Sequence, residues 1–145
     1  MQEIYINIDD SGKISKKENV CIYGGLVFLS KDEKDKFINQ YRGIIKSIKC
    51  KYCQSDNLMC NHKCPELKNS KIAPKHKRRI MNYINQYHTF ACIIQNNKIY
   101  SHIMDDKSSK GRFSDYTQKR LIKQVIKDLI KEKKVDPYKE TTLII

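Results

Sequence analysis

Two adjacent aspartates near the amino terminus are well suited to bind a metal ion. The run 4–8 alternates isoleucine with Tyr and Asn, as a strand with one buried face does, and Asp9-Asp10-Ser11-Gly12 follows it directly. If the isoleucines share one face, Asp9 lies on the other face and Asp10 points back. A strand end holds carboxylates rigidly, and Mg²⁺ needs only one or two of them plus a substrate phosphate. The alternative is a turn that simply closes the strand.

Four closely spaced cysteines form a second candidate metal site. They are Cys50, Cys53, Cys60 and Cys64. Two close pairs of thiolates can complete a tetrahedral Zn²⁺ site, and an all-cysteine site is structural because no coordination position stays open. We therefore expect a small zinc-binding insertion over residues 50–64. His62 is an alternative fourth ligand, and a loop of reduced, unliganded thiols is the alternative to any metal.

Length and charge limit the class of protein. The chain has 145 residues, which corresponds to one domain over residues 1–145. Lys and Arg number 29 and Asp and Glu 16, so the formal net charge is +13, which favours polyanionic partners, nucleic acid above all. A lysine-rich composition can also come from an AT-rich coding genome, so the charge alone does not establish a partner.

The sequence also indicates where the protein acts. It contains no stretch of about 20 apolar residues and no signal-peptide pattern, so we expect a cytoplasmic protein without a membrane partner. Cysteines in a reducing compartment rarely form disulfides, which favours metal binding or core packing for all six. No serine–histidine–acid order, phosphate-binding glycine loop or dinucleotide fingerprint is present.

Hydrophobic periodicity predicts the elements that must position these residues. Their order is strand, strand, helix, insertion, helix, strand, helix, strand, which is typical of an α/β fold with a sheet flanked by helices. We expect strands over 4–8, 20–29, 89–100 and 141–145, helices over 30–49, from 74 and over 114–134, and a polar loop over 101–112.

Two strands carry features of their own. The pair Gly24-Gly25 inside an apolar strand predicts a bulge or a close backbone approach. The final strand, 141–145, ends in Leu-Ile-Ile with no turn or cap after it, although such a strand suits a sheet interior. We therefore expect either a C-terminally truncated chain or a sheet edge completed by another chain, which includes a second copy of this one.

Three short motifs, in order along most of the chain, resemble the bacterial family catalogued as domain of unknown function 3800. They are Asp9-Asp10-Ser11-Gly12, Tyr23-Gly24-Gly25-Leu26-Val27 and Glu66-Leu67-Lys68-Asn69-Ser70-Lys71. The resemblance implies a ribonuclease H-like mixed sheet flanked by helices. It also implies metal-dependent nuclease chemistry, in which two ions about 4 Å apart clamp the attacking and leaving oxygens.

The same resemblance implies roles for individual residues. Asp9 and Glu66 would hold Mg²⁺ or Mn²⁺, and Lys68 would offset phosphate charge in the transition state. The remaining residues would supply a further oxygen donor or hold substrate phosphate, and they are Asp10, Ser70 and Lys71. Taken alone, Glu66 fits a solvated loop carboxylate better than a metal ligand.

The chain departs from the family pattern at one strand end. Family members often carry another acid after the strand that follows the second helix, where this chain has Gln95-Asn96. Asp105 or Asp106 could substitute from the loop, and the alternative is that both are solvated loop acids.

Three functions follow from these patterns. The first is a divalent-metal-dependent nuclease that hydrolyses phosphodiester bonds in RNA or DNA. The second is a non-catalytic nucleic-acid-binding module with a structural zinc site and a lysine-rich helix that grips phosphates. The third is an interaction domain whose open final strand pairs with another chain.

Overall fold

The protein has an α/β fold. The structure, a computed structural model, describes residues 1–52 and 72–145, and it describes side chains for residues 1–49 and 72–145. These residues form two compact units. Residues 1–30 and 88–145 make the sheet unit, and residues 31–87 make the helical unit, in which the described helices flank the undescribed segment.

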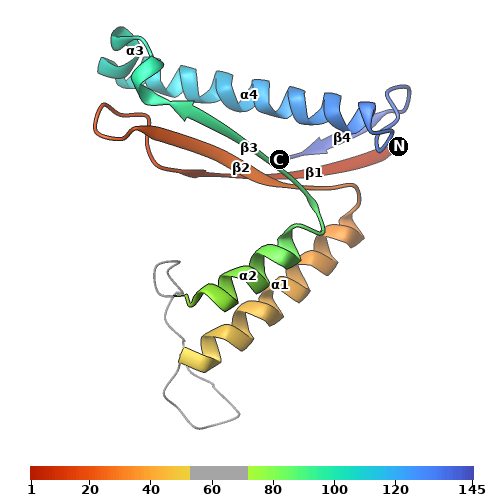
Figure 1. The fold of residues 1–145 in the computed structure, drawn as a ribbon. Helices are drawn as coiled ribbons and strands as arrows, with labels where there is room; N and C mark the ends of the chain where they lie inside the picture. Colours follow the sequence, from red (N-terminus) through yellow and green to blue (C-terminus); the bar gives the residue numbers. More distant parts are fainter. Residues whose placement is uncertain (53–71) are drawn as a thin grey trace. The chain divides into compact units, whose positions relative to one another are not determined.

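The sheet unit is built on a mixed sheet. Its described strands are β1 (Gln2–Ser11), β2 (Val20–Phe28), β3 (His88–Gln95) and β4 (Thr141–Ile144), in the order β3-β2-β1-β4 (Figure 1). β1 and β3 both run antiparallel to β2, whereas β4 runs parallel to β1. β1 is therefore a central strand, and its pairing with β4 covers only its first half.

One face of this sheet is covered by the long helix α4 (Lys107–Lys131) (Figure 1). Ile4 and Ile6 from β1 are buried in one core cluster with Val125 and Leu129 from α4. The isoleucines of β1 thus point to the helix-covered face, which confirms the predicted alternation along the strand.

The predicted polar loop over 101–112 is wrong. The chain there forms the short helix α3 (Ser101–Asp105) and the first part of α4, after a 3₁₀ turn, η2 (Asn96–Lys98). Asp106 begins α4 by accepting a hydrogen bond from the backbone N–H of Ser109 at 2.6 Å, a standard N-cap. This capping lowers the pKa of the Asp106 carboxyl.

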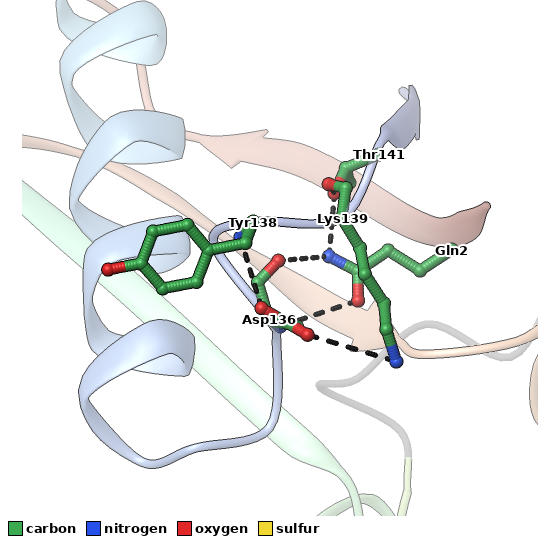
Figure 2. Close-up of polar contacts among 5 residues, drawn as sticks. All are labelled: Gln2, Asp136, Tyr138, Lys139 and Thr141. Carbon is green, nitrogen blue, oxygen red and sulfur yellow. Dashed lines mark hydrogen bonds and ion pairs between the residues drawn. The ribbon is translucent and has the colours of Figure 1, made fainter.

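The start of β1 is tied to the segment that leads into β4 (Figure 2). The Gln2 amide nitrogen donates to the Asp136 carbonyl at 2.9 Å and to the Thr141 hydroxyl at 2.6 Å. The Asp136 carboxylate in turn accepts from the Tyr138 N–H at 3.0 Å and lies 3.8 Å from the Lys139 ammonium. These contacts hold β4 in its parallel register beside β1.

The helical unit pairs α1 (Lys31–Tyr52) with α2 (Pro74–Ile84). The rings of Phe37 and Tyr83 stack with their centroids 5.4 Å apart, so the apolar faces of the two helices meet. The predicted end of the first helix near Lys49 is wrong. The helix α1 includes Cys50, the first cysteine of the predicted insertion, and ends at Tyr52.

The glycine pair of β2 permits a close backbone approach. A Cβ placed on Gly25 would lie 1.8 Å from the Asn7 carbonyl oxygen of β1 and 2.8 Å from the Phe90 ring. No side chain fits there without moving β1. The expected close approach is therefore confirmed, and it falls opposite Ile8, the residue before the two aspartates.

Candidate functional site

Asp9 lies near the end of β1 on the face opposite α4. Its side chain is exposed, and its Oδ1 accepts a hydrogen bond from the Asp10 backbone N–H at 3.0 Å. Because successive strand residues alternate, the Asp10 side chain lies on the helix-covered face instead. The two carboxylates therefore cannot act as one chelating pair without a change in the strand.

The surroundings leave the Asp9 carboxylate accessible. Its partner on β2 is Gly24, and the next residue across the sheet, on β3, is Ala91. Neither has a side chain that could cover the carboxylate. Within the described side chains, no Lys, Arg or His forms an ion pair with Asp9. An exposed carboxylate without an ion pair is a hard oxygen donor of the type Mg²⁺ prefers.

Asp10 lies against a polar group on the helix-covered face. Its partner on β2 is Tyr23, whose hydroxyl lies 2.6 Å from the Ser114 hydroxyl of α4. Burial raises the pKa of the nearby Cys21 thiol, and the negative charge of Asp10 raises it further. Cys21 is therefore a protonated, buried thiol.

Asn96 holds the loop that follows the aspartates. Gly12, with φ at +81°, turns the chain out of β1. The Asn96 side-chain amide then donates to the carbonyl oxygens of Lys13 at 2.8 Å and Glu18 at 2.9 Å. Asn96 is only 4% exposed. The position where family members often carry an acid is therefore a structural amide in this chain.

Several predicted site residues lie outside the described part of the chain. They are the site residues of the motif 66–71 and the cysteine site, in which the Cys50 backbone alone is described. The residues are Glu66, Lys68, Ser70, Lys71, Cys50, Cys53, Cys60 and Cys64.

The two loop acids considered as substitutes have structural partners. Asp105 forms an ion pair with Lys16, and Asp106 caps α4. Among the side chains that the structure describes, no group of three or more His, Cys, Asp or Glu could hold a metal ion. The Asp9 carboxylate is the kind of oxygen donor that Mg²⁺ takes, and this ion usually completes its octahedron with water and substrate phosphate oxygens.

α4 presents a strongly basic surface to solvent. Its exposed positions carry seven cationic residues and one acidic residue, Asp115. Four of the cations recur every fourth residue and so form one row along the helix. They are Lys119, Lys123, Lys127 and Lys131, which we call the lysine row.

A second row on α4 was not singled out in the sequence. Tyr116 is 57% exposed, and the Arg120 guanidinium carbon lies 5.8 Å from the centroid of its ring. This pair could have been predicted from the sequence, because an aromatic residue and an arginine four positions apart in a helix lie close together.

Comparisons with protein-family models, with curated proteins and with solved structures found no match for this chain. A search of the helices in the described segments found none with the length and apolar character needed to cross a bilayer.

Replacing Asn96 should destabilise the sheet unit. Asn96→Ala leaves two carbonyl oxygens without this donor and should lower the free energy of unfolding by about 1–3 kcal/mol in urea denaturation. Asn96→Asp should cost more at pH 7 than at pH 4. A carboxylate facing carbonyl oxygens has a raised folded-state pKa, so stability falls as pH rises through that value.

The exposed neighbour supplies the matched control. Asn97→Ala should change the free energy of unfolding by less than about 0.5 kcal/mol. Equal effects at positions 96 and 97 would show that the loop is not held by this amide.

Proposed function

We propose that this chain is a divalent-metal-dependent nuclease with a ribonuclease H-like fold. The observation that carries the proposal is the exposed Asp9 carboxylate near the end of central strand β1, which forms no ion pair with a described side chain. Further support comes from the mixed sheet, in which three antiparallel strands are followed by a fourth that is parallel to the first. Such a sheet is compatible with the fold that the family resemblance implies.

The proposed chemistry assigns a role to each site residue. Asp9 and Glu66 would hold Mg²⁺ or Mn²⁺, which would polarise the phosphate and activate the attacking water when bound. Lys68 would offset charge on the phosphate, and Ser70 and Lys71 would help to hold it. Apart from Asp9, these assignments rest on the family resemblance.

The net charge of +13 supports nucleic acid as the substrate class. Phosphate binding releases counterions from the polyanion, so cationic surface favours association with RNA or DNA of any sequence. RNA and DNA remain equal candidates on charge alone.

Asp9→Asn should abolish cleavage. With Mn²⁺ or Mg²⁺ present, the purified chain should cut single-stranded RNA or DNA, and the variant should be slower by more than about 100-fold. Loss even of a residue that only supports a metal ligand costs about 10- to 100-fold. The measurement is the rate of product formation on denaturing gels.

Asp35→Asn, which removes an exposed carboxylate on α1, is the matched control and should retain the full rate. Circular dichroism should show that both variants are folded. Wild-type rates in Asp9→Asn would remove the proposed metal ligand from the mechanism.

We also propose a structural zinc ion bound by Cys50, Cys53, Cys60 and Cys64. Elemental analysis should find one zinc per chain, because four thiolates close a tetrahedral site. Cys53→Ser and Cys60→Ser should each lose the metal. Cys92→Ser, a partly buried thiol of β3, should retain it. Zinc-free wild-type protein with reactive thiols in the insertion would contradict this site.

A non-catalytic nucleic-acid-binding module is the second candidate, and the lysine row on α4 favours it. Changing Lys119, Lys123 and Lys127 to Gln should weaken binding at low salt. It should also reduce the slope of log K against log salt concentration by about 2, since each phosphate contact on a single strand contributes about 0.7.

The control for this variant removes the same charge elsewhere. Lys31, Lys36 and Lys46 are exposed on α1, and changing them to Gln should leave the salt slope largely intact. If both triple variants lose equal affinity, net charge rather than the lysine row drives the binding.

A further inference from the structure

A groove runs between the free edge of β3 and α4, within the sheet unit. β3 is the end strand of the sheet as far as the structure describes it, and its sequence contains no Lys, Arg, Asp or Glu. The groove has a volume of about 690 Å³. We call it the β3–α4 groove.

The walls of the groove are largely apolar. Phe113 and Leu121 of α4 line it on one side, and Ile94 and Ile99 line it on the other. An apolar depression beside an unpaired strand edge is a surface that favours a ligand with flat, uncharged parts.

The rim of the groove is cationic and aromatic. Lys98 and Arg120 line it, and no acidic side chain does. The Arg120 guanidinium lies against the exposed ring of Tyr116, with its Nη1 3.5 Å from the ring hydroxyl. This contact restrains a flat aromatic surface at the groove, and the lysine row continues the positive surface along the same helix.

We propose that the β3–α4 groove binds single-stranded nucleic acid, with a base stacked on Tyr116 and phosphates near Arg120 and Lys98. Aromatic platforms combined with cationic grooves are how proteins hold unpaired strands. A duplex would not use the platform, because its bases are already stacked on one another. The groove's positive charge and its exposed tyrosine together favour this ligand over an uncharged polypeptide strand.

This inference rests on the nucleic-acid partner proposed above but not on hydrolysis. Binding is therefore measured in EDTA, where no metal-dependent cleavage occurs. If the groove variants bind the strand as wild type does while Asp9-dependent cleavage is observed, only the groove assignment is lost. If cleavage fails and groove binding survives, only the nuclease proposal is lost.

The probe is a fluorescein-labelled strand of about 12 thymidines, followed by anisotropy. Tyr116→Ala should weaken its binding about tenfold, whereas Tyr116→Phe, which keeps the ring, should bind within about twofold of wild type. Tyr138→Ala is the matched control, because Tyr138 is 96% exposed and lies outside the groove.

A strand of the same length with abasic sites tests the stacking directly. Wild type should bind it about tenfold more weakly than the thymidine strand, and Tyr116→Ala should bind both alike. Unchanged binding in Tyr116→Ala would overturn the proposal. Equal affinity for the abasic strand would also overturn it, because binding would then depend on charge alone. Equal affinity for a poly-glutamate peptide of matched charge would overturn it as well, because the surface would then bind an acidic polypeptide.

Discussion

Ile4 and Ile6 of β1 are buried against Val125 and Leu129 of α4. This packing determines which side chains of the sheet unit face solvent. Each fully buried aliphatic side chain contributes about 1.5–3 kcal/mol. A register shift of one residue would expose the isoleucines and turn Asp9 into the core face. The packing therefore holds the Asp9 carboxylate on the face opposite α4, where it is exposed.

The same helix supplies the surfaces proposed to bind nucleic acid. An α-helix has 3.6 residues per turn, so residues four apart stay close together while neighbouring rows point in different directions. One row of α4 residues is buried in the core, and a second row contains Tyr116 and Arg120 beside β3. The third is the lysine row. Docking of the apolar row against the sheet thus orients the other two.

Sequence patterns predicted the positions of the four strands, because alternation along β1 is a strong local signal, although the third strand ends at Gln95 and not at Tyr100. The region 101–112 was misjudged, since its polar residues match a loop as well as an exposed helix start. Asp106 decides between them by capping α4. Asn96 could not be predicted, because its amide contacts residues about 80 positions away along the chain.

The sequence by itself determined which side chains of β1 share a face, that the middle of the chain gathers cysteines, and that the protein is strongly basic. Those properties depend on composition and on neighbours along the chain. Only the tertiary structure decided that Gly24 and Ala91 lie beside Asp9, and that β3 borders Tyr116. Strand order and register bring together residues from distant parts of the chain, and local periodicity carries no information about that pairing.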